Sequence, residues 1–122
     1  LIAIRRRNHK IFLKLFKNDK RFIIQKFIGQ HSCFAFTLLL KPKYTRLKEK
    51  LFSLLKKNKI ECRLITGGSF FKHPVKQFFS FSKFNGSTNV DYIHENGFFV
   101  GNHPKNPDNE LVFFKKVLDS IR

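Results

Sequence analysis

Two short polar turns carry most of the side chains that could do chemistry. The first, residues 66–69, has the sequence Thr-Gly-Gly-Ser and leads to His73 and a proline. The second, residues 101–104, has the sequence Gly-Asn-His-Pro. Each turn follows an apolar segment of strand-like length, so the pattern predicts a polar binding edge at the ends of two strands.

The first turn has both a functional and an ordinary interpretation. Arg63, in the apolar segment before it, could pair with a phosphate or carboxylate through its planar guanidinium, or be an exposed strand residue. Gly67 and Gly68 could bring main-chain N–H groups close to a ligand, or form an ordinary turn. Both interpretations stay open on spacing alone.

The histidines and Asn102 also have a functional and an ordinary interpretation. His73, just before a proline, could carry a proton or donate a hydrogen bond, or simply start a helix. Asn102 and His103 fit either a polar binding turn or a plain loop. The remaining histidines show no metal-ligand spacing with one another, so we interpret them as ordinary residues: His9, His31 and His94.

No further motif for chemistry is present. Cys33 and Cys62 match no zinc or redox motif, so the sequence predicts two buried free thiols and no metal site. Unpaired thiols are typical of a reducing cytoplasm, which is the expected location. We find no Ser/His/Asp set, Walker loop or dinucleotide fingerprint.

Composition predicts one small domain with an apolar core. The chain has 122 residues, of which 42% are hydrophobic and 17 are phenylalanine. Its net charge of +17 is compatible with nucleic-acid binding, but the charges are scattered and mostly lysine, so we do not favour it. No apolar run reaches membrane-spanning length, and no signal peptide is evident. The first residues resemble the middle of an element, so we expect a C-terminal fragment of a longer protein.

Periodicity predicts the elements that position these turns. We expect a helix over 4–17 with a basic solvated face, a buried strand over 32–40 and a helix over 43–58. Asn58 is the expected left-handed end of that helix. A strand follows over 60–65 and ends at the two glycines. Residues 21–31 give no clear pattern.

The second half is predicted as short helices around one strand. Pro74 should open a short helix whose buried side is Val75, Phe78 and Phe79. Asn85-Gly86 marks a turn, and a helix from Thr88 should end at Gly97. Residues 98–100 form a strand, and Asn106-Pro107 starts the last helix. The expected fold is α+β, an α/β layer with a small three- to four-stranded sheet and packed helices.

Several short segments together resemble the C-terminal small domain of the DegT/DnrJ/StrS family of pyridoxal-phosphate enzymes, a fold type I architecture that acts on nucleotide-linked sugars. Arg6, Arg7 and Asn8 look like the end of that family's inter-domain helix. The resemblance thus implies residues 1–20 as the end of this helix and 21–122 as the small domain. The matching segments are 60–65, 66–70, His73-Pro74, 89–93 and 97–104.

Within the family, the two turns look most like the 4-keto-6-deoxyhexose 3-dehydratase branch. Those enzymes remove a sugar C3 hydroxyl in lipopolysaccharide O-antigen biosynthesis, with pyridoxal 5'-phosphate as cofactor and glutamate as possible amino donor. They use a histidine in place of the Schiff-base lysine. A sugar aminotransferase of the same family is the nearest alternative, and a basic nucleic-acid-binding module is the alternative of another class.

The resemblance also implies which roles belong to the large domain and which to this fragment. The catalytic residues and most of the cofactor site are expected in a large domain that precedes this fragment, in a cytoplasmic homodimer. The fragment alone should be inactive. The residues expected to face the sugar substrate are Arg63, Gly67, Gly68, Ser69, His73, Asn102 and His103.

Overall fold

The fold is a four-stranded antiparallel sheet with helices packed on it, seen in a computed structural model that describes residues 1–65, 67–82, 86, 88–105 and 107–121. The strand order is β1-β2-β4-β3. The strands are β1 (Phe22–Ile24), β2 (Ala35–Leu40), β3 (Cys62–Leu64) and β4 (Gly97–Gly101). The α-helices are α1 (Ile2–Phe16), α2 (Lys48–Lys57), α3 (Thr88–Asn96) and α4 (Asp108–Asp119). The expected α+β class is confirmed.

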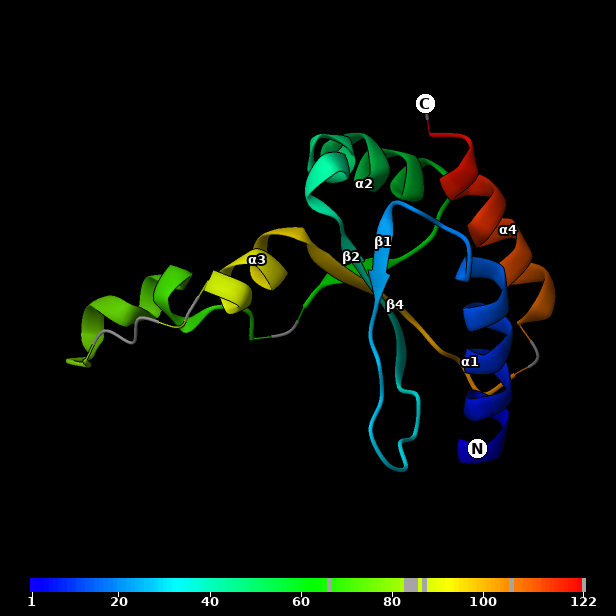
Figure 1. The fold of residues 1–122 in the computed structure, drawn as a ribbon, viewed down its shortest axis with the longest axis horizontal. Coiled ribbons are helices and arrows are strands. Elements are labelled where there is room, and N and C mark those ends of the chain that lie inside the picture. Colours follow the sequence, from blue (N-terminus) through cyan, green and yellow to red (C-terminus); the bar gives the residue numbers. More distant parts are fainter. Residues whose placement is uncertain (66, 83–85, 87, 106, 122) are drawn as a thin grey trace.

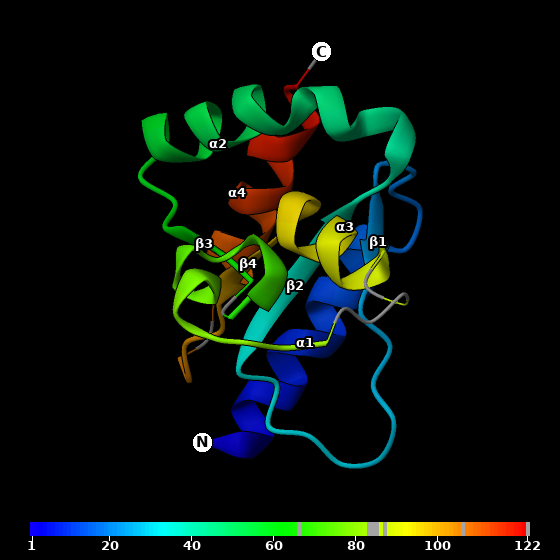
Figure 2. The same cartoon turned by 90° about the vertical axis from the view of Figure 1, so that its left-hand side faces the viewer.

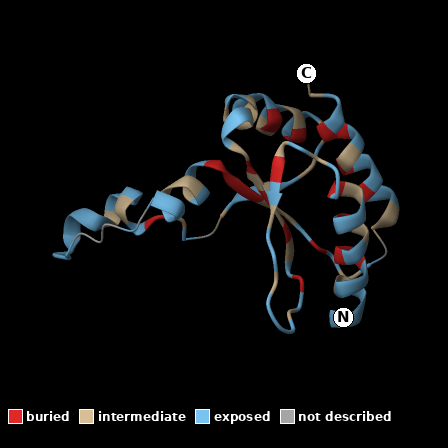
Figure 3. Ribbon diagram, in the orientation of Figure 1, coloured by how far each residue is buried: buried red, intermediate tan, exposed pale blue. Residues whose placement is uncertain are grey.

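One face of the sheet carries the core. Strand β2 alternates between buried and half-buried side chains, which is the pattern of a strand with one covered face. Helices α1 and α4 lie side by side against that face, and α2 packs beside α4 (Figure 1). Phe12 of α1 stacks on Phe36 of β2 with ring centroids 4.9 Å apart. The buried residues gather between these layers (Figure 3): Phe12, Phe16, Phe22, Phe36, Leu38, Leu40, Leu51, Leu55, Phe98, Leu111, Phe114, Val117 and Leu118.

The opposite face of the sheet is apolar but only partly covered. We call it the open face and define it as Ile23, Phe34, Ala35, Thr37, Leu39 and Phe99, which line one pocket together with Ile65, Ile93 and others. Helix α3 lies across part of it (Figure 2). The Tyr92 hydroxyl of α3 donates to the Leu40 carbonyl at 2.5 Å, which ties the helix to β2. Burial raises the pKa of Tyr92, which favours the protonated, donating form.

Residues 67–82 form an arm that projects away from the sheet (Figure 1). It contains the 3-10 helices η2 (Phe70–Lys72) and η3 (Pro74–Phe78). The prediction that Phe78 and Phe79 are buried is wrong: their exposed fractions are 76% and 59%. The aromatic side chains instead contact one another within the arm, as Phe70 does with Phe79 and Phe81.

The other elements mostly follow the sequence pattern, with local corrections. Strand β1 was not predicted, because three residues are too short to show a period. The strand predicted over 32–40 begins only at Ala35, since Cys33 adopts a left-handed backbone with φ 53°. Helix α2 is preceded by the 3-10 helix η1 (Pro42–Leu47). Asn58 is not left-handed, and Lys59 takes that conformation instead with φ 56°.

The last helix is confirmed from Asp108 onward, with Leu111, Phe114 and Leu118 buried as predicted. Three residues assigned from sequence to turns or to the start of this helix lie outside the described residues: Thr66, Asn85 and Asn106. None of the helices in the described ranges is long and apolar enough to cross a membrane.

Candidate functional site

Helix α3 holds the glycine turn in place. The Ser69 main-chain N–H donates to His94 Nδ1 at 3.1 Å, and the Ser69 hydroxyl donates to the Asp91 carboxylate. Ser69 is fully buried. Its hydroxyl therefore supports the turn from inside and does not face solvent. Because His94 Nδ1 accepts a hydrogen bond, the neutral ring carries its proton on Nε2.

The two glycines are needed for different reasons. Both have left-handed backbones, with φ 81° at Gly67 and φ 52° at Gly68. A Cβ atom on Gly68 would lie 2.0 Å from His94 Nδ1, whereas one on Gly67 would meet nothing within 4 Å. Gly68 is thus required by packing as well as by conformation. Gly67 is required by conformation alone and stays open to an approaching group.

Arg63 is an exposed cation three residues before this turn in the sequence. It pairs with Phe99 in the β3–β4 ladder, which places it on the same side of the sheet as the open face. Its guanidinium contacts the Glu61 carboxylate at 2.7 Å, but the two side chains are 70% and 76% exposed. An ion pair this exposed contributes little to stability. Arg63 is therefore able to exchange Glu61 for an anionic ligand.

His73 sits at the start of η3 in the arm. Its Nδ1 accepts a hydrogen bond from the Val75 main-chain N–H at 3.2 Å, so it caps this short helix as the sequence suggested. The ring is exposed, which leaves Nε2 free to contact a ligand. Next to it, Lys72 contacts Glu95 of α3 and links the arm to the domain. The hydrogen bond with Glu95 raises the pKa of Lys72.

Asn102 is part of a buried polar network. Its Oδ1 accepts from Asn8 Nδ2 at 3.1 Å, and its Nδ2 donates to the carbonyls of Arg5 and Cys33 at 2.9 and 2.8 Å. Asn102 is only 2% exposed, so all of its side-chain groups are used inside the protein. His103 follows it at the surface, where its carbonyl accepts from Asn8 Nδ2.

The two polar turns do not form one edge in this chain. Strands β3 and β4 are antiparallel, with Leu64 opposite Phe98 and Cys62 opposite Val100. The glycine turn therefore lies near the start of β4, whereas Asn102 follows its end. The five residues of β4 separate the two turns by about 14 Å at roughly 3.4 Å per residue. The expectation of a shared binding edge is wrong for the chain by itself.

Sequence reasoning missed the residues that position the turns. His94 was interpreted as ordinary, and Asp91 fell within a predicted helix without a role of its own, yet both hold Ser69. Asn8 was noted only as part of a helix, yet it is fully buried against Asn102. The available signal was the position of Asn8 one turn before Phe12 and two turns before Phe16, in line with the buried stripe of the helix. An asparagine in that position needs hydrogen-bond partners, because an unpaired amide is costly to bury.

Two relatives share the name GDP-4-keto-6-deoxy-D-mannose 3-dehydratase. The one from Escherichia coli O55:H7 is 33% identical over 118 residues, 96% of this chain and 30% of the relative. The one from Yersinia pseudotuberculosis is 38% identical over 103 residues, 84% of this chain and 26% of the relative. The solved E. coli enzyme with bound hydrated PLP matches 96% of this chain with a TM-score of 0.89. The resemblance to pyridoxal-phosphate-dependent sugar dehydratases is confirmed.

The chain spans about 30% of the length of these dehydratases. The same fold occurs in a Helicobacter pylori aminotransferase of pseudoaminic acid biosynthesis, which is 14% identical and matches 99% of this chain with a TM-score of 0.82. No family model matches the chain. The likeness to the dehydratases thus rests on relatives and solved structures that extend across almost all of this sequence.

Proposed function

We propose that this chain is the C-terminal part of a pyridoxal-phosphate-dependent enzyme that removes the C3 hydroxyl of a GDP-linked 4-keto-6-deoxy sugar. The observation that carries the proposal is the match to the E. coli 3-dehydratase over 96% of the chain, at 33% identity and a TM-score of 0.89. In this proposal residues 1–20 end an inter-domain helix, and residues 21–122 are the small domain.

The open face supports a role as one layer of a larger protein. Sheets in small mixed domains are normally covered where they are apolar. Here Ile23 and Phe34 are 44% and 66% exposed, and the aromatic arm adds Phe78 at 76%. Exposed apolar surface of this kind is typical of an interface. We propose that the large domain of the same enzyme packs against the open face and the arm.

The described residues offer no buried lysine for a Schiff base with the pyridoxal ring, and Lys115, which is 19% exposed, contacts Asp19 and Asp119. The dehydratase branch replaces that lysine by a histidine, so the assignment of the cofactor rests on length: this chain spans 30% of the relative that carries bound PLP. We propose that the cofactor, which acts as an electron sink when bound, is held mainly by the rest of the enzyme. The solved relatives carry bound hydrated PLP in one case and a trapped PLP-glutamate geminal diamine in another.

The part played by this chain is to hold the charged end of the substrate. One solved relative contains bound GDP-perosamine, a nucleotide-linked sugar. Arg63 presents a planar guanidinium that can pair with two oxygens of a diphosphate. Gly67 leaves the main chain open beside it, and His73 offers Nε2. We propose these three residues, with Gly68 and Ser69 shaping the turn, as the substrate-facing group. His103 is proposed as a separate contact at the surface, with the buried Asn102 before it fixing the turn from inside.

The direct test is the product formed by the full-length enzyme from GDP-4-keto-6-deoxymannose, with pyridoxal phosphate and glutamate present. We expect a GDP-sugar that has lost its C3 hydroxyl. A product with an amine in place of the keto group would make the enzyme an aminotransferase. An unchanged sugar would overturn the proposal.

The substrate-binding role is tested in the same assay with Arg63→Ala. A charge-assisted hydrogen bond contributes about 1.5–3 kcal/mol to substrate binding. Its loss should therefore raise KM by about tenfold or more with little change in kcat. Arg46→Ala removes another exposed arginine and should leave KM unchanged. Equal KM values for the two variants would exclude Arg63 from the site.

Partner and location follow as further proposals. We propose a homodimer, which light scattering of the full-length enzyme would show directly, with a monomer as the contrary result. Cys33 and Cys62 are both free thiols. Free thiols fit a reducing compartment, so we propose that the enzyme works in the cytoplasm.

A further inference from the structure

A histidine, a second histidine and a cysteine meet beside the first helix. His9 comes from α1, whereas His31 and Cys33 come from the loop before β2. One ligand atom from each of the three lies within 4.8 Å of the other two. The Cys33 Sγ atom is 2.9 Å from His31 Nδ1. His9 and Cys33 are 6% and 3% exposed, and His31 is half-buried.

The main chain of both loop residues is held by side chains from other elements. Arg6 Nε donates to the His31 carbonyl at 2.8 Å. Asn102 Nδ2 donates to the Cys33 carbonyl at 2.8 Å. Cys33 also keeps a left-handed backbone, with φ 53°, which is unusual for a residue with a side chain. In this conformation the Cys33 Sγ atom lies within 4.8 Å of a ring nitrogen of His9 in α1.

Aromatic contacts orient the two imidazole rings. Phe27 stacks on His31 with ring centroids 3.8 Å apart and meets the edge of His9 at 5.0 Å. The two imidazoles are themselves edge to face at 5.5 Å. Rings fixed by packing lose little freedom when they bind an ion, which is the condition for a preorganised metal site.

The donor set determines which ion fits. Two imidazole nitrogens and one thiolate sulfur suit Zn²⁺, which binds such ligands tetrahedrally. With Zn–S of about 2.3 Å and Zn–N of about 2.0 Å, the two donor atoms lie about 3.5 Å apart. Cys33 Sγ and His31 Nδ1, now at 2.9 Å, would need to separate by only about 0.6 Å.

An open pocket adjoins the three ligands. Its lining includes Gln25, Gln30 and the basic residues Arg6, Lys10 and Lys26. The thiolate would supply the negative charge that a cation needs among these basic residues. The pocket leaves a fourth coordination position accessible to water, as in zinc sites with three protein ligands.

We propose that His9, His31 and Cys33 form a binding site for one Zn²⁺ ion, which joins helix α1 to the loop before β2. The site is separate from the proposed substrate group of Arg63, Gly67 and His73, because its residues lie in α1 and that loop, whereas those three lie in β3 and the arm. Asn102 contacts the zinc site only through the Cys33 carbonyl.

The test uses the 122-residue chain without a histidine tag, titrated with Co²⁺ as a spectroscopic probe and then with Zn²⁺. We expect one ion per chain, with visible bands of tetrahedral Co²⁺ and a near-ultraviolet thiolate-to-cobalt band that Zn²⁺ abolishes. Cys33→Ser should remove the thiolate band and weaken Zn²⁺ binding more than about tenfold. Cys62→Ser is the matched control and should bind as the unaltered chain does.

A second pair of variants covers the case in which Cys33→Ser does not fold. His31→Ala should also weaken Zn²⁺ binding more than about tenfold, and His103→Ala should not. Bound Zn²⁺ should raise the unfolding temperature of the unaltered chain but not of His31→Ala. The proposal is overturned if Zn²⁺ shows no saturable binding, or if His31→Ala binds as tightly as His103→Ala.

Discussion

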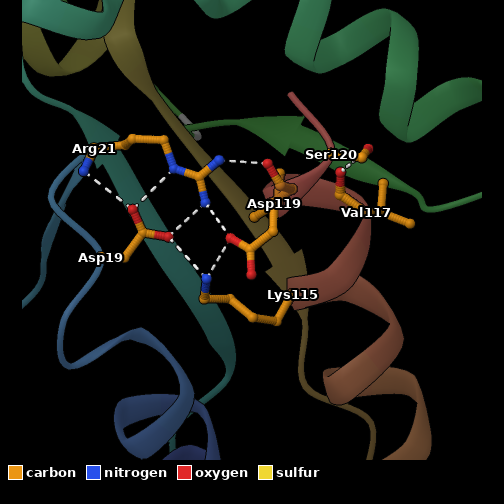
Figure 4. Close-up of polar contacts among 7 residues, drawn as sticks. Asp19, Arg21, Lys115, Val117, Asp119 and Ser120 are labelled. Carbon is orange, nitrogen blue, oxygen red and sulfur yellow. Dashed lines mark hydrogen bonds and ion pairs between the residues drawn. The ribbon is translucent and has the colours of Figure 1, made fainter. Parts of the chain in front are cut away.

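Replacing Asp19 by asparagine should destabilise the fold more than the same change at Asp119, the other carboxylate in the network of Figure 4. Its side chain is 3% exposed. The carboxylate accepts from the Arg21 main-chain nitrogen at 3.0 Å, from Nε at 2.9 Å and from Nη2 at 2.6 Å. Lys115 Nζ, from α4, lies 3.3 Å from it. Asp19 thus joins the loop after α1 to the last helix.

The magnitude follows from these contacts. Asparagine keeps the shape of the Asp19 side chain but removes the negative charge that faces Arg21 and Lys115. Hydrogen bonds to charged groups are worth about 1.5–3 kcal/mol each, and a broken buried pair costs about 3–5 kcal/mol. Arg21 keeps Asp119 and the Leu118 carbonyl as acceptors, which reduces the cost. We therefore expect Asp19→Asn to lower the free energy of unfolding by about 2–4 kcal/mol.

The pH dependence is a second, independent sign that the ionised Asp19 carboxylate stabilises the fold. Burial opposes ionisation of Asp19, but hydrogen bonds from Arg21 and Lys115 outweigh it, so the pKa of Asp19 is lowered. A lowered carboxyl pKa adds stability above the unfolded pKa of about 3.9, and this stability is lost as the pH falls through the folded value. The difference between the original chain and Asp19→Asn should therefore narrow as the pH falls below about 4.

Urea unfolding followed by circular dichroism measures both effects. With a slope of about 2 kcal/mol per molar urea, the midpoint of Asp19→Asn at neutral pH should fall by about 1–2 M. Asp119→Asn is the matched control, because Asp119 is 51% exposed and should contribute less than about 1 kcal/mol. The reasoning is refuted if the two variants unfold at the same urea concentration, or if the difference persists unchanged in acid.

Further variants test the turns and the core in the same unfolding assay. Gly68→Ala should cost more than about 2 kcal/mol because its Cβ would clash with His94, and Gly67→Ala only about 1 kcal/mol from its backbone conformation. Equal costs would contradict the clash. Asn102→Ala should cost about 2–4 kcal/mol, since it removes the side-chain donor to the carbonyls of Arg5 and Cys33 in a buried network. Phe12→Ala should cost about 3–5 kcal/mol, whereas the exposed Phe79→Ser should change stability by less than about 0.5 kcal/mol. Similar values for these last two variants would refute the assigned core.

Much of the fold was predictable because its helices are long enough to show a repeating pattern of hydrophobic residues. The ten residues of α2 bury Leu51 and Leu55, one turn apart, and α4 buries Leu111, Phe114 and Leu118. Both patterns were visible in the sequence as helical stripes. Strand β1 was not predicted, because its three residues take their structure from pairing with β2.

The arm shows the limit of reading burial from hydrophobicity. Phe78 and Phe79 were expected to be buried because they are aromatic, yet both are exposed. Hydrophobic side chains favour burial in the assembled protein, and the surface that covers them need not belong to the same segment of chain. A sequence pattern indicates that a residue favours burial without indicating against what.

The sequence by itself determined the local features of this protein. It predicted the strand before the first turn, the turn at Gly67 and Gly68, the helix start at His73 and the apolar stripes of the helices, because these depend on neighbours within a few residues. It also carried the likeness to the dehydratases, because the short matching segments keep their order along the chain.

Only the tertiary structure decided which distant side chains meet. The antiparallel pairing of β3 and β4 moved the two polar turns to opposite ends of a strand. The packing of α1 against the loop before β2 brought His9 to His31 and Cys33. Spacing along a chain limits contacts only between near neighbours, and contacts across a hundred residues depend on which faces are buried together.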